Sequence, residues 1–554
     1  MFKYLHCYMP ETWDGLVKRG FINEDSGIRF IQGIRLKEED KFNKLAAKNG
    51  VLYNMVKKNN MPFYIDRLQG GSFIQDYPYD MNIVKDYCEE LGENFWGFQM
   101  HEWMTNIYSD LSRIHKSNCP YIEGTLKWRE EDIVNYILKA HPYKYVHLEA
   151  MNAKEYAEVG DIQNAEEYIA VAARLYEKRQ KYTGGYLLPC DAGCQPYQIE
   201  FKNGTKRIMI EIGAQTSDTR FQFAYARGMA KAYNVQFGAY YEPWLSAVID
   251  GKWVYSSCNY HKQGLNEWRL AGDGPYKTQG ENGGSSRSMQ RRMHLYSYIA
   301  GASFVSEEWG MCNTFYDWND FEISPYVQIK LDFINFTQKY KDIGKIYTPI
   351  AIVLPEKLEM VEKIRSVDYH ICCGFEASER LTELAKRIRP TLCRLFTETE
   401  EMIGTEKVSL VNNDFPDVFD VVHEDRFDSD SYEYLIDLTG NSKFAKKYSQ
   451  KICDVNDVKP LLNKIMPCRV EGGLHHIVNK ADNGCYYLMI FNHNGVVRTA
   501  EKGETTLKEV DKTVTVECKD NRSLAMLEGN SEIRCENGVN YITVPAGGWF
   551  FGRF

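Results

Sequence analysis

The sequence predicts an α/β protein with a (β/α)8 barrel, followed by a small α/β domain and a C-terminal antiparallel β-sandwich. Eight strand-like segments, nearly all followed by helical patterns, occupy about the first 340 of the 554 residues. The hydrophobic pattern then changes twice, near Gly344 and near Cys468. Several early strands also end on an acidic residue, at the end where parallel barrels build their sites. We expect domains at residues 1–345, 346–466 and 467–554.

The clearest unit of the pattern is a strand, a helix and a second strand near the middle of the barrel region. In Arg207–Gly213, isoleucines alternate with Met209 and Glu211, which gives one apolar face and one face that carries a carboxylate. Thr219–Tyr233 has helical spacing, and Gln236–Tyr241 reads as the second strand. A helix that crosses between two strands makes them parallel. This unit supplies the expected sixth and seventh strands.

Six further segments show the same alternation, or a short apolar run between turn residues. They are Gly27–Leu36, Pro62–Leu68, Phe95–Trp103, Tyr143–Asn152, Tyr186–Asp191 and Ser303–Trp309. The first two dozen residues are expected to form a loop or a lid. Pro189 lacks a backbone N–H, which counts against a central position for its strand. A doubly wound sheet is the alternative, but the count of eight and the acidic strand ends favour the barrel.

The two smaller domains follow from the change of pattern after Gly344. Thr348–Leu354 is a short apolar run typical of a buried strand, and Asp417–Val422 and Tyr434–Leu438 are expected to be strands of the same layer. From Cys468 onward, short alternating runs are separated by turn residues, as in a β-sandwich.

The composition limits the class of protein. A net charge of −9 without a basic cluster argues against nucleic acid or an anionic membrane as a partner. The sequence shows no signal-like leader and no run of about 18 apolar residues. Its 15 cysteines suit free thiols in a reducing compartment, so a cytoplasmic protein is expected. No nucleotide, flavin or zinc motif occurs, so no cofactor and no metal are expected.

Acidic residues end five of the expected strands, and a tryptophan follows three of these ends. The acidic residues are Glu102, Glu149, Glu211, Glu242 and the pair Glu307 and Glu308, and the tryptophans are Trp103, Trp244 and Trp309. Glycoside hydrolysis needs two carboxyl groups at one bond, one to donate a proton and one to attack or to activate water. Because barrel strands converge on one mouth, the pattern predicts cleavage of a carbohydrate, with indole rings stacked on the sugar.

Alternation decides between the two glutamates of the last strand. Adjacent strand residues face opposite sides, so Glu307 and Glu308 cannot both enter the mouth of the barrel. Glu308 is favoured because it shares a face with Ser306. For Asp66 and Arg67 two interpretations stay open, namely contacts to sugar hydroxyls or an ordinary salt bridge.

Five short segments, EIGAQ, AYARGMAKA, FGAYYEPW, SEEWG and the closing PAGGWFFGRF, resemble stretches of glycosidase-like proteins. With the domain order, they make the chain similar to the trimerising β-galactosidases, whose middle domain is amidotransferase-like. This resemblance implies a retaining glycosidase whose acid/base ends strand four and whose nucleophile ends strand seven. By strand count these are Glu149 and Glu242. The clan usually has asparagine before the acid/base, whereas Leu148 stands here, so Glu211 remains a rival acid.

Together these patterns predict a retaining O-glycosidase acting on a small glycan, with Glu149 and Glu242 as the catalytic pair and Glu211 as the alternative acid/base. The expected substrate-binding residues are Asp66, Arg67, Glu102, Trp103, Trp244, Glu308 and Trp309. By analogy with the resembling family, a homo-oligomer is possible. Two alternatives use the same residues, a carbohydrate-binding barrel without catalysis and a carbohydrate lyase or isomerase.

Overall fold

The computed structural model describes most of the chain between Phe2 and Phe554. The residues that it does not describe are 1, 9, 11–12, 31–40, 67–79, 141–147, 149, 194–195, 214–217, 243–245, 250–251, 256–285, 309–313, 315–322, 324–325, 357–370, 373, 398–409, 500–502 and 521. No helix in the described part of the chain is both long and apolar enough to cross a bilayer.

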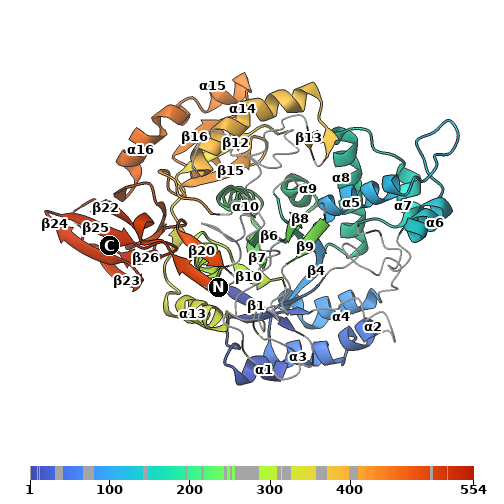
Figure 1. Cartoon of the computed structure of the whole chain (residues 1–554), viewed down its shortest axis with the longest axis horizontal. Helices are drawn as coiled ribbons and strands as arrows, with labels where there is room; N and C mark the ends of the chain where they lie inside the picture. Colours follow the sequence, from blue (N-terminus) through green and yellow to red (C-terminus); the bar gives the residue numbers. More distant parts are fainter. Residues whose placement is uncertain are drawn as a thin grey trace.

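Eight parallel strands close into a barrel, which confirms the predicted fold class (Figure 1). In spatial order they are β1 (Lys3–Tyr8), β10 (Phe304–Glu307), β7 (Gln236–Glu242), β6 (Arg207–Gly213), β5 (Leu187–Asp191), β4 (Phe95–His101), β3 (Phe63–Ile65) and β2 (Ser26–Phe30). The helices of this region are α1 (Trp13–Lys18), α2 (Lys41–Ala46), α3 (Val51–Asn59), α4 (Asn82–Glu90), α5 (Trp103–Lys116), α6 (Glu130–Ala140), α7 (Ala153–Val159), α8 (Ala165–Tyr182), α9 (Tyr197–Lys202), α10 (Thr219–Tyr233), α11 (Arg287–Ile299) and α13 (Val327–Lys339).

One loop prediction and one strand prediction are wrong, and together they shift the numbering of the first four barrel strands. The start of the chain is not a loop, because Lys3–Tyr8 forms β1, a strand buried on both faces that shows no alternation. The barrel closes without Tyr143–Asn152. Within that segment Leu148 and Ala150–Asn152 are not in a strand, and the rest lies outside the described residues. Strand four of the barrel is therefore β4.

Alternation along the strands decides which side chains enter the barrel. Its interior is filled by Leu5, Tyr64, Trp96, Leu188, Cys190, Met209, Tyr240 and Phe304. The isoleucines of β6 pack outward instead, in the main core with α10. Glu211 and Glu242 lie two residues beyond Met209 and Tyr240, so both carboxyl groups enter the C-terminal end of the barrel.

Strand β4 carries a bulge that changes its alternation. Trp96 enters the barrel, and immediately after it the pairing of β3 with β4 skips one residue. Gly97 stands there with a φ of 113°, and a Cβ atom would lie 2.3 Å from the carbonyl oxygen of Tyr186, so only glycine fits. Beyond the bulge His101 faces the interior, where its ring meets Tyr240.

A small α/β layer packs on the outside of the barrel, beside α10 (Figure 1). Its parallel sheet has the order β15 (Phe419–His423), β12 (Ile350–Leu354) and β16 (Tyr434–Asp437), and its helices are α14 (Glu379–Phe396), α15 (Ser442–Lys447) and α16 (Val458–Ile465). Gly228 of α10 lies against β15, where a Cβ atom would come within 2.2 Å of the Val421 carbonyl oxygen. The helix and the sheet therefore touch backbone to backbone.

Buried ion pairs join α10 to this layer. Arg220 pairs with Asp417 at 2.7 Å, and Arg227 pairs with Asp420 at 2.6 Å. Lys231 also binds Asp420. Since a buried charge that loses its partner is expensive, these pairs fix the small layer to the helix that connects β6 with β7.

The described C-terminal part of the chain forms two larger antiparallel sheets and a two-stranded one of β20 (Val496–Thr499) and β21 (Gly503–Thr506). One contains β11 (Lys345–Ile346), β18 (His475–Lys480), β19 (Tyr486–Phe491), β26 (Trp549–Arg553) and β23 (Ala525–Gly529), and the other contains β17 (Cys468–Glu471), β22 (Lys512–Cys518), β25 (Val539–Val544) and β24 (Glu532–Glu536). Apolar side chains of both sheets belong to the same core as the barrel helices and the small layer. The three parts thus share one continuous core.

Candidate active site

Three glutamates meet at the C-terminal end of the barrel. Glu211 on β6, Glu242 on β7 and Glu308, directly after β10, each place a carboxylate oxygen within 4.8 Å of the other two. All three residues are buried, and only Glu308 has any measurable exposure, at 4%. We call these three residues the acidic cluster. The structure thus brings together three of the residues that the sequence singled out.

The environment of Glu242 favours its protonated form. Burial raises the pKa of this carboxyl well above its usual value, and the negative charges of Glu211, Glu308 and Glu102 raise it further. Apart from the neighbouring carboxyl of Glu211, neither Glu242 oxygen has a hydrogen-bond partner among the described residues. Two carboxyl groups can share a hydrogen bond only when one of them holds a proton. Burial and the neighbouring negative charges therefore both favour a protonated carboxyl in the acidic cluster.

The close approach of two strands sets the position of Glu242. Gly213 is the last residue of β6 and pairs with Glu242. A Cβ atom on Gly213 would lie 2.5 Å from the carbonyl oxygen of Glu242 and 2.7 Å from its Cβ atom. Any side chain at Gly213 would have to displace Glu242, so the glycine is required by the site rather than by a turn.

His101 stands between the acidic cluster and Glu102. Its Nε2 atom lies 3.5 Å from Glu211 and 3.7 Å from Glu308, and its Nδ1 atom lies 3.7 Å from Glu102. Both ring nitrogens donate only in the imidazolium form. The Glu102 side chain is 29% exposed, so among these groups it is the one that water reaches best.

Glu102 has an unusual backbone conformation. Its φ of 43° and ψ of 37° place it in the left-handed region, which non-glycine residues seldom occupy and which is typical of functional positions. Its N–H donates to the carbonyl oxygen of Cys190 at 2.7 Å, and its own carbonyl accepts from Asn106 at 2.8 Å. These bonds hold the turn between β4 and α5 in a single geometry.

Trp103 does not line the mouth, so its predicted role in sugar stacking is wrong. The left-handed turn at Glu102 makes Trp103 the first residue of α5. Its indole is fully buried in the core behind the barrel, beside Tyr176. Its Nε1–H donates to Glu200 of α9 at 2.9 Å. Trp103 therefore anchors the helix that follows Glu102.

The two glutamates of the last strand separate as alternation predicts. Glu308 joins the acidic cluster. Glu307 faces the helix layer, where it pairs with Lys330 at 2.6 Å, His294 at 3.0 Å and the Tyr4 hydroxyl at 2.6 Å. The nearby Lys330 and His294 lower the pKa of Glu307 to about 2, although burial acts in the opposite direction.

Asp66 takes part in a buried ion pair with Arg29. The Arg29 Nη2 atom lies 2.9 Å from Asp66, and both side chains are almost fully buried. Arg29 also donates to the backbone carbonyl of Glu307 and lies over the ring of Tyr240. Of the two interpretations open for Asp66, the salt bridge is present. Its partner, however, is Arg29, and the pair borders the acidic cluster through Tyr240 and Glu307.

Four of the predicted site residues are not placed by the structure. Glu149, Arg67, Trp244 and Trp309 lie outside the described residues. Their roles stay predictions.

The sequence analysis missed two further groups at this end of the barrel. Asp191 ends β5 and is buried, and burial together with the charges of Glu200, Glu102 and Glu211 raises its pKa well above the usual value. It ends a predicted strand, so the rule that selected the glutamates could have found it. Arg29 gave no such signal, because it lies inside its predicted strand, Gly27–Leu36, and is not an acidic residue at a strand end.

Two groups of side chains have the spacing of a cation site. Among the described residues they are the acidic cluster itself and the set of His101, Cys190 and Glu211, whose donor atoms also lie within 4.8 Å of one another. The carboxylate set suits a hard cation, and the mixed set suits zinc or a similar metal. Burial and neighbouring charges raise the pKa of the Cys190 thiol well above its usual value, so this ligand is protonated in the metal-free site. The absence of a metal stays a prediction.

Comparison with known proteins gives distant structural matches. No family model matches the chain, and no curated protein matches its sequence. The catalytic module of a family 98 glycoside hydrolase from Streptococcus pneumoniae matches with 10% identity over 100% of this chain and 98% of that one, at a TM-score of 0.42. An α-L-fucosidase from Paenibacillus thiaminolyticus matches with 9% identity over 100% and 98%, at 0.48. A β-galactosidase from Halorubrum lacusprofundi matches with 9% identity over 99% and 98%, at 0.45. These likenesses are too remote to bear on the chemistry of the site.

Proposed function

We propose that the protein is a glycoside hydrolase that cleaves an O-glycosidic bond of a small glycan. The observation that carries this proposal is the acidic cluster at the C-terminal end of the barrel, whose burial and crowding favour the protonated form of Glu242, with a more exposed carboxylate, Glu102, nearby. Hydrolysis of a glycoside requires both species at once, a carboxylic acid and a carboxylate. The end of the barrel is also the place where barrel enzymes bind substrate.

Glu242 is the proposed proton donor. A general acid must hold its proton at the working pH, and both burial and like charges favour the protonated form of Glu242. The resemblance noted from the sequence gives the nucleophile role to this end of strand seven. The electrostatics of the resting site favour the opposite role.

Glu102 is the proposed nucleophile. Glu211 and Glu308 lie within 4.8 Å of Glu242 and are almost fully buried, whereas the Glu102 side chain is 29% exposed. Glu102 lies on the far side of the His101 ring from Glu211 and Glu308, and it is the most accessible of these groups. It also ends strand four, the position that the resemblance gives to one catalytic residue.

The remaining residues would bind and orient the sugar. Glu211 and Glu308 are proposed to accept hydrogen bonds from hydroxyl groups, and the pair of Asp66 and Arg29 to fix the wall beside Tyr240. Arg67, Trp244 and Trp309 keep their predicted roles as hydroxyl and stacking contacts. We propose a retaining mechanism, a carbohydrate substrate and no cofactor.

The test compares leaving groups. Wild type, Glu242→Ala and Glu102→Ala are assayed on a panel of 2,4-dinitrophenyl glycosides and on the matching phenyl glycosides. Loss of the acid should slow the phenyl glycoside by about 10²–10⁴-fold and spare the activated one. Loss of the nucleophile should abolish both, and azide should restore turnover of the activated substrate as a glycosyl azide.

A matched control and two contrary outcomes complete the test. Glu158→Ala changes an exposed glutamate on α7 and should behave as wild type. If the phenotypes of the two variants are exchanged, the roles of Glu242 and Glu102 are exchanged. If both variants turn over phenyl glycosides at the wild-type rate, or if sugars bind without any product, hydrolysis at this site is ruled out and the carbohydrate-binding alternative gains support.

A further inference from the structure

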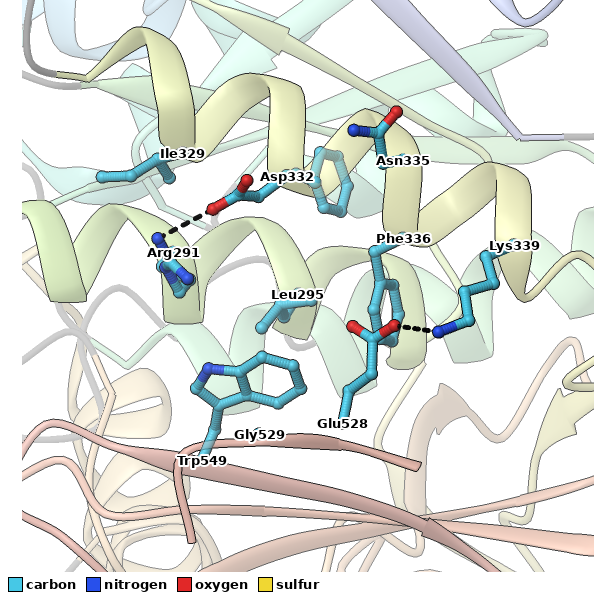
Figure 2. Close-up of a pocket in the computed structure, with 11 residues that line it drawn as sticks. Arg291, Leu295, Ile329, Asp332, Asn335, Phe336, Lys339, Glu528, Gly529 and Trp549 are labelled. Atoms are coloured by element: carbon cyan, nitrogen blue, oxygen red, sulfur yellow. Dashed lines mark hydrogen bonds and ion pairs between the residues drawn. The ribbon is translucent and has the colours of Figure 1, made fainter. Parts of the chain in front are cut away.

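A groove of about 420 Å³ lies outside the barrel, where two barrel helices meet the β-sandwich (Figure 2). Its walls come from α11, α13, β23 and β26. No function proposed above uses it. Its size falls in the range of small-molecule sites, and all of its lining residues belong to the described part of the chain.

The floor of the groove is apolar and aromatic. Trp549, Phe336 and Leu295 form it, and the ring centroids of Phe336 and Trp549 are 6.0 Å apart in an edge-to-face arrangement. Figure 2 shows the indole of Trp549 next to Leu295, on the side of the groove that the β-sandwich forms. The indole is 9% exposed and lines the groove, so it offers a small apolar surface of the kind against which the C–H groups of a sugar ring pack.

The rim of the groove carries two ion pairs, one at each end. Arg291 lies 3.0 Å from Asp332 at one end, and Lys339 lies 2.6 Å from Glu528 at the other. Asn335 adds an exposed amide between them. The four charges cancel, so the groove does not select an ion. It does offer fixed donors and acceptors at both ends, which suits a neutral ligand with many hydroxyl groups.

A strand irregularity places Glu528 at this rim. The pairing of β23 with β26 slips between Met526 and Glu528, which marks a β-bulge. The residue after it, Gly529, has a φ of 130°, and a Cβ atom there would lie 2.5 Å from the Trp549 carbonyl oxygen. Bulges redirect side chains and are common beside sites. Here the bulged strand presents Glu528 to Lys339 and to the Tyr340 hydroxyl, 3.1 Å away.

We propose that this groove is a second carbohydrate site, which binds one or two neutral hexose units without cleaving them. The sugar ring lies on Trp549, and its hydroxyl groups bond to Glu528, Asn335 and Asp332. The assignment rests on the composition of the groove and is independent of the catalytic roles proposed for Glu242 and Glu102.

The test uses lactose and cellobiose as probes of the full-length chain. Glu242→Ala protein is labelled with 5-fluorotryptophan, and the resonance of Trp549 is identified from its absence in Trp549→Phe. Addition of either disaccharide should move that resonance. Asn335→Ala and Glu528→Gln should each weaken this response about tenfold, as expected for a lost hydrogen bond to a polar or charged partner. Neither should change the turnover of aryl glycosides when placed in the wild-type chain.

Controls separate this site from the barrel. Glu517→Gln changes an exposed glutamate elsewhere on the sandwich and should leave the Trp549 response intact. A Trp549 resonance that neither disaccharide moves, or one that responds in Asn335→Ala and Glu528→Gln as strongly as in the parent Glu242→Ala protein, overturns the proposal. If the wild-type chain turns over aryl glycosides but the Trp549 resonance does not move, only the proposal of a second carbohydrate site is contradicted. If the Trp549 resonance moves but no aryl glycoside is turned over, only the proposed hydrolase function is contradicted.

Discussion

Replacing Glu200 by glutamine should stabilise the chain, and increasingly so as the pH rises. Glu200 is buried in α9 and accepts a hydrogen bond from Trp103. Burial raises the pKa of this carboxyl from 4.5 to about 8, although the bond from Trp103 acts in the opposite direction. Glutamine keeps an oxygen to accept the Trp103 hydrogen bond and removes the group that must ionise in a buried place.

The sign and size of the expected change in stability follow from the pKa of Glu200 in the unfolded chain and in the folded chain. Below pH 4.5 the carboxyl is protonated in both the folded and the unfolded chain, so the substitution changes little. Between pH 4.5 and about 8 the unfolded chain releases the proton first, and the free energy of unfolding falls as the pH rises. A shift of about 3.5 units corresponds to at most about 5 kcal/mol. Asp191 interacts with Glu200, so part of this energy belongs to the pair.

The assay is urea denaturation of wild type and Glu200→Gln across pH 5 to 8.5, followed by tryptophan fluorescence. The stability difference should be small at pH 5 and reach several kcal/mol in favour of the variant near pH 8. Glu158→Gln, at an exposed position on α7, should show no such trend. A difference that stays constant with pH, or one that favours wild type at high pH, would refute the reasoning.

Three further predictions concern the site and the junctions. Gly213→Ala should lower kcat at least tenfold with the fold retained, because its Cβ would lie 2.5 Å from the Glu242 carbonyl oxygen; circular dichroism and kinetics check this. Arg227→Met should destabilise the chain by about 3–5 kcal/mol in urea, since it removes one partner of the buried Asp420. Burial lowers the pKa of His476 from 6.5 to about 4, so the stability it contributes is present above pH 6.5 and is lost as the pH falls toward 4. His476→Gln should remove up to about 3 kcal/mol of that acid sensitivity, as measured by the same denaturation between pH 7 and 4.

Local periodicity was enough to predict the barrel but not to number its strands. In YKYVHLEAMN alternation favours a strand, yet the barrel is complete without that segment. In KYLHCY both faces of the strand are buried, so no alternation marks it. Which segments close a barrel is decided by long-range pairing. Because of this miscount, the prediction placed Glu149 at the end of strand four, where the structure has Glu102.

The residues of the candidate site were also predictable only where the backbone is regular. Glu211 and Glu242 lie in regular strands and Glu308 directly follows one, so the period of two was enough to predict the direction of their side chains. Trp103 follows a bulge at Gly97 and a left-handed residue at Glu102. Each of these changes the direction of the chain without a clear mark in the sequence. Side chains beyond such irregularities can be placed only when the backbone is known.

Helix α10, which lies between β6 and β7, limits where this chain can be truncated. It connects β6, which carries Glu211, with β7, which carries Glu242. Along its length the small α/β layer touches its backbone at Gly228 and neutralises Arg220 and Arg227. A fragment ending at residue 345 would leave two guanidinium groups and a bare stripe of helix facing water. We expect such a fragment to lose the alignment of its glutamates, so the smallest unit that keeps the geometry of the acidic cluster is larger than the barrel that contains it.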